Sequence, residues 1–281
     1  MSGRRRPNSR GAAGKGSDAM KPVIVRSVAL GSGPPKLCAP LVGADGQAVL
    51  AEASALRGLP VDMAEWRFDK ARAALCPAGQ TPDAAGARPL VGLLGALGPA
   101  LGELPLLFTY RTAAELSGRA GPGPADYASI LGAACRSQWV DLVDIELNRG
   151  AALARSLAAQ ARALGALPLV SLHDFEKTPS VEAMTAALLA MEDAGAALAK
   201  LAVTPQNPQD VLNLFAAMEK ARSRLQIPFT AMGMGRLGML TRLGGGLFGA
   251  AFTFGAAGEQ SAPGQPPAGA LRAALTMLYG D

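Results

Sequence analysis

The chain has 281 residues, of which 49% are hydrophobic and only 5% aromatic, so it can bury a sizeable core of small and aliphatic side chains. The net charge is +5, but five basic residues and one acidic residue within the first 19 positions carry +4 of it. The remaining chain is near neutral, which argues against nucleic-acid binding by a folded basic surface. One histidine and three widely spaced cysteines, Cys38, Cys76 and Cys135, argue against a metal site and fit reduced thiols in a cytoplasmic protein.

Residues 1–20 have the composition of a disordered basic tail. The run Arg4-Arg5-Arg6 is followed by Gly, Ala, Ser and Asn rather than by the apolar stretch of an export signal. No apolar run in the chain reaches the roughly 18 to 20 residues that a membrane helix needs. We therefore expect no membrane association.

After the tail, loosely alternating residues from Pro22 to Ala29 and a turn at Gly31-Ser32-Gly33 predict a short N-terminal β-hairpin. Short apolar runs then alternate with longer Ala/Leu-rich segments of helical spacing. The predicted strands are 37–41, 63–67, 106–110, 142–145, 168–171, 199–203, 229–232 and 249–254. The predicted helices include 47–56, 125–137, 151–164, 181–191 and 208–224.

Several of these helices carry boundary signals. Ser180 and the pair Asn207-Pro208 are typical helix starts, and Gly165 is typical of a helix end. Strands that alternate with helices indicate an α/β fold with a parallel sheet, either open and doubly wound or closed. Eight units in about 245 residues favour a (β/α)8 TIM barrel. We predict that residues 21–281 form this barrel as one catalytic domain, with the hairpin at its start.

Polar residues gather at the predicted strand ends, where the active sites of such barrels lie. They are Glu65, Arg67, Arg111, Asp144, Glu146, His173, Arg242, Ser261 and Gln265, and Lys200 lies within a strand.

Lys200 lies in Ala-Ala-Leu-Ala-Lys-Leu-Ala-Val, and the nearest charged residue in the sequence is Asp193. Burial disfavours the charged form of an amine, and a neutral amine can attack a carbonyl to form an iminium. A lysine that only extends its ammonium to the end of the sheet is the alternative for this segment alone.

His173 is the only histidine, and it follows the apolar strand 168–171 in Ser-Leu-His-Asp-Phe. Imidazole can both take and give a proton near neutral pH. A hydrogen-bonded structural histidine is the alternative. Because Lys200 lies one strand–helix unit further on, a barrel would bring the two groups to the same rim.

Arg67, Arg111 and Arg242 come from three different strand ends. Guanidinium groups suit carboxylates and polar oxygens, so their convergence predicts an anionic small-molecule substrate. Salt bridges within the protein are the alternative, and the candidate partners are Glu65, Glu115 and Glu146.

The run Gly233-Met-Gly235-Arg-Leu-Gly238 has the spacing of a dinucleotide fingerprint, and Glu259 lies about 20 residues further on. In such a fingerprint the acidic residue ends the next strand. Glu259 instead lies in a Gly/Ser/Pro loop beyond the last predicted strand. We therefore do not predict nicotinamide binding.

Taken in order, these residues resemble the type I 3-dehydroquinate dehydratases, from about Pro22 to the C-terminus. The most specific stretches are Glu65-Trp-Arg67, Ser171-Leu-His-Asp-Phe175 and Ser261-Ala-Pro-Gly-Gln265. Further matches are Pro35 to Gly43, Phe108 to Arg111, Asp144 to Leu147, Lys200 to Pro205, Met232 to Gly235, Thr241-Arg242 and Thr253 to Gly255.

The resemblance implies dehydration of 3-dehydroquinate to 3-dehydroshikimate in the shikimate pathway of aromatic amino acid biosynthesis, with no metal or organic cofactor. Lys200 matches the family's Schiff-base lysine, His173 its general acid/base, and Glu115 the glutamate that partners this histidine. Arg242 matches the arginine that binds the substrate carboxylate. The other substrate-binding positions that match are Glu65, Arg67, Arg111, Ser261 and Gln265. A homodimer is expected from the resemblance alone.

Three positions depart from the family pattern. Pro40 stands where some members have a serine near the substrate, and Gly233 and Thr241 replace the usual serines. Two other functions stay open at this stage. A class I aldolase also places a Schiff-base lysine in a barrel, and a non-enzymatic barrel could bind a sugar acid. The second would need neither Lys200 nor His173.

Overall fold

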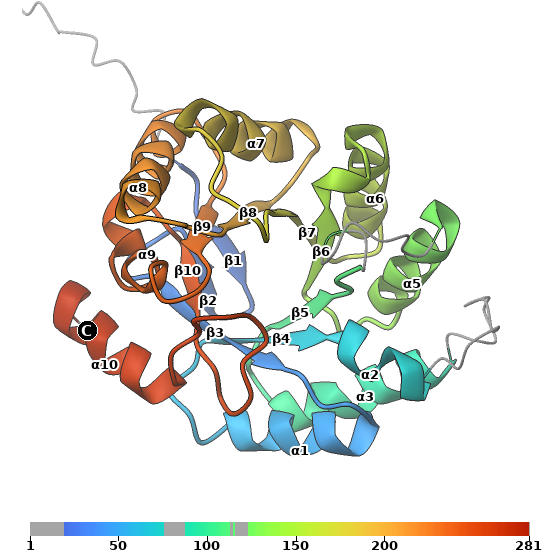
Figure 1. The fold of residues 1–281 in the computed structure, drawn as a ribbon. Helices are drawn as coiled ribbons and strands as arrows, with labels where there is room; N and C mark the ends of the chain where they lie inside the picture. Colours follow the sequence, from blue (N-terminus) through green and yellow to red (C-terminus); the bar gives the residue numbers. More distant parts are fainter. Residues whose placement is uncertain (1–19, 76–87, 113–114, 116–122, 281) are drawn as a thin grey trace, which may run out of the picture.

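The computed structural model describes residues 20–75, 88–112, 115 and 123–280 (Figure 1). An eight-stranded parallel sheet in the order β10-β3-β4-β5-β6-β7-β8-β9 is surrounded by helices. A parallel bridge between Phe229 and Ala250 connects its two edges. The predicted (β/α)8 barrel is therefore confirmed. Residues 1–19 of the expected tail, and Cys76, lie outside the described residues, while Cys38 and Cys135 are free and buried.

The barrel strands agree with the predicted segments, mostly to within one or two residues. They are β3 (Lys36–Leu41), β4 (Met63–Arg67), β5 (Leu106–Thr109), β6 (Leu142–Glu146), β7 (Leu167–His173), β8 (Leu198–Val203), β9 (Phe229–Gly233) and β10 (Phe252–Phe254). The last strand is shorter than predicted, because Gly249 takes a left-handed conformation at φ 91° and ends the preceding 3-10 turn.

The helices also begin where the sequence indicates. Ser180 accepts a hydrogen bond from the Ala183 amide, and Asn207 accepts one from the Asp210 amide. Gly165 has φ 88° just after a helix. The helical elements are α1 (Gly46–Leu56), α2 (Phe68–Leu75), α3 (Arg88–Leu101), α5 (Pro124–Arg136), η1 (Leu147–Arg149), α6 (Ala151–Ala163), α7 (Val181–Asp193), α8 (Pro208–Arg222), α9 (Met239–Gly244), η2 (Gly245–Phe248) and α10 (Ala268–Tyr279).

The N-terminal hairpin is present, and the chain also turns at Gly31-Ser32-Gly33 as predicted, but this turn follows the hairpin and does not connect its two strands. Strands β1 (Val23–Val25) and β2 (Val28–Leu30) pair antiparallel, so the chain reverses at Arg26 and Ser27. Arg26 takes a left-handed φ of 51°, and its side chain donates to Asp141 at 2.9 Å and to the Gly102 carbonyl at 2.8 Å. These tertiary bonds offset the strain at a non-glycine residue, and they were not visible in the sequence.

The hairpin packs against the amino-terminal end of the barrel. Val25 and Leu30 belong to the same buried cluster as Met63 and Leu107 of the barrel strands. Asp141, which holds Arg26, also accepts the Leu106 amide at 2.8 Å. The barrel interior is therefore filled at this end.

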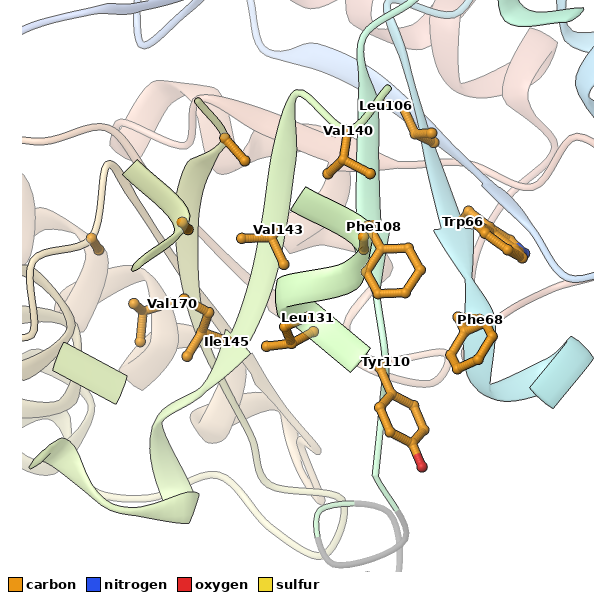
Figure 2. Packing of buried hydrophobic residues seen from close by; sticks show 14 of the residues in the cluster. Trp66, Phe68, Leu106, Phe108, Tyr110, Leu131, Val140, Val143, Ile145 and Val170 are labelled. Carbon is orange, nitrogen blue, oxygen red and sulfur yellow. The ribbon is translucent and has the colours of Figure 1, made fainter. Parts of the chain in front are cut away.

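The larger core lies between the strands and the helices (Figure 2). Trp66 packs edge-on against Phe68 and Phe108, with ring centroids 5.6 Å apart in both pairs, and Phe68 lies 5.4 Å from Tyr110. Because side chains alternate along a strand, Trp66 points to this layer while its neighbours Glu65 and Arg67 face the barrel interior. Within the described ranges, no helix is both long and apolar enough to cross a membrane.

Candidate active site

A cavity lies inside the barrel at the carboxyl ends of the strands. Eight of the nine predicted site residues line it. The lining comprises Glu65, Arg67, Arg111, His173, Phe175, Lys200, Ala202, Met232, Met234, Arg242, Phe254, Ser261, Ala262 and Gln265. The ninth predicted residue, Glu115, lies just behind His173.

Strand alternation places the central lysine in this cavity. Lys200 and Ala202 of β8 line the cavity, whereas Leu201 and Val203 pack into the outer core. The Lys200 side chain is only 6% exposed. Its Nζ lies 3.3 Å from Glu65 Oε1, 3.7 Å from Asp144 Oδ2 and 4.5 Å from the centroid of the Phe254 ring.

These contacts place charged groups around Lys200 that its own sequence segment does not contain. Its neighbours along the chain are uncharged, but two carboxylates approach it from β4 and β6. Both carboxylates lie within ion-pair distance of its Nζ, and Glu65 is the nearer of the two. The register of the parallel strands brings Lys200 level with Ser171 on β7 and Thr230 on β9.

His173 forms a pair with Glu115. Glu115 Oε1 accepts the His173 backbone amide at 2.9 Å and lies 3.2 Å from His173 Nδ1. Because an ionised carboxylate only accepts, this contact places the imidazole proton on Nδ1 and leaves the Nε2 lone pair free. Burial, and next the charges of Arg111 and Lys200, hold the His173 pKa well below its usual value. The neutral ring is therefore available as a base.

Arg111 is the centre of a buried cluster of carboxylates. Its Nη1 contacts Glu115 and lies 3.1 Å from Glu146, and its Nη2 donates to Asp144 at 2.7 Å. Burial lowers the Arg111 pKa, but these three carboxylates outweigh burial and raise it well above its usual value. The sequence left salt bridges within the protein as the alternative interpretation for the arginines, and Arg111 forms such salt bridges.

Asp144 responds to the same charges in the opposite direction. Burial raises its pKa, but Arg111 and Lys200 outweigh burial and hold the pKa below its usual value. Asp144 Oδ1 also accepts from Ser171 Oγ at 2.7 Å. Asp144 contacts both Arg111 and Lys200, and Ser171 hydrogen-bonds to both Asp144 and Arg111. The sequence placed Asp144 at a strand end but did not indicate this connection.

Arg67 connects the barrel to the segment that covers the cavity. It makes a bidentate ion pair with Asp69, with both contacts at 2.8 Å, and donates to the Ser261 carbonyl at 3.1 Å. The Ser261 amide donates to Gln265 Oε1 at 2.9 Å, and Gln265 is only 3% exposed. The chain between β10 and α10, drawn in red, passes in front of the barrel strands in Figure 1.

Arg242 is buried, and none of the described carboxylates forms an ion pair with it. It is 2% exposed, and its Nη1 lies 3.3 Å from Met232 Sδ. Within the described part of the chain its Nε has no hydrogen-bond partner. Burial lowers its pKa to about 10. Because an isolated buried cation is costly, a guanidinium that lines a cavity in this way is suited to bind an anionic ligand.

The glycine motif before Arg242 forms a compact loop. A Cβ on Gly238 would lie 2.2 Å from the Gly233 carbonyl oxygen, so only glycine allows this approach. Thr241 Oγ1 accepts the Gly233 amide at 2.8 Å and donates to the Gly238 carbonyl at 2.6 Å. Gly233 and Thr241, which depart from the family pattern, therefore belong to the loop contacts that orient α9 and Arg242. The close approach of Gly238 to Gly233 explains why glycines stand at these two positions.

Several cavity residues were not predicted. Phe175 stacks on His173 at a centroid distance of 5.8 Å, and Met232, Met234 and Phe254 form apolar walls. Their apolar side chains look like ordinary core residues in the sequence. Among the described residues, no three His, Cys, Asp or Glu side chains are grouped as a metal site.

Comparisons with known proteins agree with this arrangement. A family profile described as type I 3-dehydroquinase matches residues 37–281. The 3-dehydroquinate dehydratase of Geobacillus kaustophilus is 38% identical over 258 residues, which cover 92% of this chain and 96% of that protein. A crystal structure of the enzyme from that organism has a TM-score of 0.85 at 37% identity, covering 93% of this chain and 98% of that one. A Clostridium difficile type I 3-dehydroquinate dehydratase with covalently modified comenic acid has a TM-score of 0.84 at 32% identity, with coverages of 92% and 98%.

Proposed function

Because the chain belongs to the type I 3-dehydroquinase family, we propose that it dehydrates 3-dehydroquinate to 3-dehydroshikimate through a Schiff base on Lys200. This reaction is a step of the shikimate pathway. One observation supports the mechanism most strongly: a buried lysine amine faces the same cavity as a neutral histidine and an uncompensated arginine. Residues 21–281 act as one catalytic domain.

Substrate binding begins with the carboxylate. Arg242 supplies the only cavity-lining guanidinium among the described residues that has no carboxylate partner. A substrate carboxylate would restore its charge balance and form charge-assisted hydrogen bonds. Glu65, Arg67, Arg111, Ser261 and Gln265 provide polar groups for the ring hydroxyls and for closing the site.

Schiff-base formation requires neutral Lys200. Its ammonium proton passes to a neighbouring carboxylate, of which Glu65 at 3.3 Å is the nearer. The amine then adds to the ketone carbon of the substrate, and the resulting carbinolamine loses water to give an iminium. His173 can transfer protons in this step and in the final hydrolysis.

The iminium drives the elimination because it withdraws electrons from the adjacent carbon. His173 Nε2 removes a proton from that carbon. The protonated His173 then gives this proton to the hydroxyl on the neighbouring carbon, and the hydroxyl leaves as water. One water is released, and a carbon–carbon double bond conjugated with the iminium and the carboxylate is formed. Glu115, 3.2 Å from His173 Nδ1, stabilises the transient imidazolium.

Closure of the segment around Ser261 and Gln265 protects these intermediates from bulk water. The Ser261 carbonyl already accepts from Arg67, and Gly264 meets Gly235 so closely that a Cβ would lie 2.4 Å from the Gly235 oxygen. We propose that these contacts hold the closed position when the substrate is bound.

The test is to mix purified protein with 3-dehydroquinate, without added metal or nucleotide, and to follow ultraviolet absorbance. We expect a rise from the conjugated enone carboxylate. Borohydride added during turnover should reduce the iminium and leave a stable mass increase on the peptide that contains Lys200. A flat absorbance trace from folded protein would overturn the assigned substrate.

The same experiment separates the dehydratase from a class I aldolase. A dehydratase product is lighter than the substrate by one water, whereas retro-aldol cleavage of a ring carbon–carbon bond opens the cyclic substrate and gives a single open-chain isomer of unchanged mass. Mass spectrometry of the product distinguishes these outcomes. A homodimer in the cytoplasm is our expectation for the assembly, and analytical ultracentrifugation tests its oligomeric part.

A further inference from the structure

Asp144, one of the two carboxylates beside Lys200, is fixed at both of its oxygens. Its Oδ1 accepts from Ser171 Oγ at 2.7 Å, and its Oδ2 accepts from Arg111 Nη2, also at 2.7 Å. Loss of either donor would therefore leave the other to hold the Asp144 carboxylate in place.

Glu65, the other carboxylate beside Lys200, is fixed at one oxygen only. Its Oε1 accepts from Thr109 Oγ1 at 2.8 Å and lies 3.3 Å from Lys200 Nζ. Among the described residues, no further donor or cation contacts the Glu65 carboxylate. Thr109 is thus the one neutral group of the described chain that orients this side chain.

The hydroxyl of Thr109 has no other visible purpose in the structure. Thr109 is fully buried and does not belong to the cavity lining. Its neighbour Phe108 packs into the outer core, so strand alternation turns the Thr109 side chain toward the barrel interior. An ionised carboxylate only accepts hydrogen bonds, so the hydroxyl proton is directed at Glu65. Thr109 can therefore act on the reaction only through Glu65.

The register of the strands gives this hydrogen bond a direction. Thr109 on β5 is level with Arg67 on β4, two residues beyond Glu65 toward the carboxyl end of the barrel. The bond therefore holds the Glu65 carboxylate on the side of the cavity, which Glu65 lines. Because Oε1 is engaged by Thr109 and Lys200, Oε2 has no partner in the described part of the chain. It is available to accept a hydrogen bond from a ligand hydroxyl.

We infer that Thr109 is a positioning residue, which holds Glu65 with one oxygen beside Lys200 and the other open to the cavity. The catalytic effect rests on the proposed function, in which Lys200 is the nucleophile, but the orientation of Glu65 does not. The attacking amine is neutral, so at that stage its ion pair with Glu65 no longer exists. The Thr109 hydrogen bond is then the contact that keeps Glu65 in place.

Crystal structures without substrate test the positioning directly. Thr109→Val replaces the hydroxyl with a methyl group, so we expect the Glu65 carboxylate to rotate from its native position or to adopt more than one conformation. Thr109→Ser keeps the hydroxyl and should keep the native position. An unchanged Glu65 in Thr109→Val would overturn the inference. This result does not depend on activity, so a wrong assignment of the substrate would be recognised separately by the absorbance assay.

Kinetics test the effect on the reaction. Thr109→Val should lower kcat/KM by about tenfold or more, because it removes a hydrogen bond to a charged group. Thr109→Ser should stay within about threefold of the native value. Thr109→Ala is a second variant without the hydroxyl and should show the same loss as Thr109→Val. An equal loss in the serine and valine variants, or native kcat/KM in the valine variant, would contradict the positioning role.

The matched control is Thr185→Val in α7. It also removes a buried threonine hydroxyl, but one that donates to the Val181 backbone carbonyl at 2.8 Å. It should retain native kcat/KM. A loss as large as that of Thr109→Val would mean that removal of any buried hydroxyl slows the enzyme, and it would overturn the inference.

A double-mutant cycle shows whether Thr109 acts through Glu65. In a Glu65→Ala background the Thr109 hydroxyl has lost its acceptor, so adding Thr109→Val should change the remaining kcat/KM by less than about twofold. Circular dichroism should show that each variant is folded. A further tenfold loss in the Glu65→Ala background would mean that Thr109 acts by another route, which contradicts the inference.

Discussion

Two buried arginines on different walls of the cavity have opposite environments. Arg111, after β5, contacts three carboxylates and has a raised pKa. Arg242, in α9, donates from its Nη1 to Met232 Sδ and has no carboxylate partner among the described residues, and burial lowers its pKa to about 10. The comparison teaches that burial of the same residue type serves different purposes. Arg111 holds three carboxylates together, whereas Arg242 has no carboxylate partner among the described residues and is the group that we propose binds the substrate carboxylate.

Lys200 lines the same cavity as these two arginines, and its loss should have the largest effect. Lys200→Ala removes the nucleophile, so we expect kcat to fall by about 10⁴-fold or more and the borohydride adduct to disappear. Lys220→Ala, at an exposed lysine of α8, is the control and should retain native activity. Near-native turnover of Lys200→Ala would exclude the Schiff-base mechanism.

Removal of Arg111 should destabilise the protein, because three buried carboxylates lose their common cation. Arg111→Met leaves Glu115, Asp144 and Glu146 close together without their shared cation. Breaking a buried ion pair by removing one partner costs about 3–5 kcal/mol. Urea unfolding at pH 7 should therefore show a loss of this size. A loss below about 1 kcal/mol would mean that the carboxylates reorganise or take up protons at little cost.

Removal of Arg242 should differ from removal of Arg111, because it should weaken substrate binding without lowering the free energy of unfolding. Arg242→Met removes an uncompensated buried charge, so the free energy of unfolding should be unchanged or increased. The substrate carboxylate loses its partner, and KM for 3-dehydroquinate should rise by about 10- to 100-fold. Equal destabilisation of Arg242→Met and Arg111→Met would contradict the different environments that we assign to the two arginines.

The pH dependence of stability should show the smallest of these effects. Glu146 has a folded-state pKa raised to about 8, so its contribution is complete below its unfolded value and is lost as the pH rises from there through about 8. His173 has a lowered pKa, so its contribution is complete above its unfolded value of about 6.5 and is lost as the pH falls below it.

Between about pH 6.5 and pH 8 only the Glu146 contribution changes, so urea unfolding should show a loss of stability as the pH rises through this range, while below about pH 6.5 the two contributions oppose each other. Glu146→Gln should remove the loss above pH 6.5 and expose the loss on acidification that His173 causes. A native chain that is equally stable at pH 7 and pH 9 would contradict the assignment for Glu146.

Much of the fold follows from local patterns in the sequence. Apolar runs separated by helical segments identified the barrel strands, and Ser180 and Asn207 begin helices as their side chains indicate. These signals act between residues that are close in the chain, where strand alternation and helix capping apply directly. The same alternation places Glu65, Arg67 and Lys200 on the inner face of the barrel.

The partners of these residues could be decided only by the tertiary structure. Lys200 meets Glu65 across 135 positions, Arg67 meets the Ser261 carbonyl across 194, and Arg26 takes its left-handed turn because Asp141, 115 positions away, holds its side chain. Apart from the family resemblance, the residues themselves presented Arg111 and Arg242 as equivalent arginines at strand ends. Which of them is neutralised depends on the carboxylates that neighbouring strands bring to the same depth of the barrel, because a buried charge is governed by what surrounds it in space and not by what precedes it in the chain.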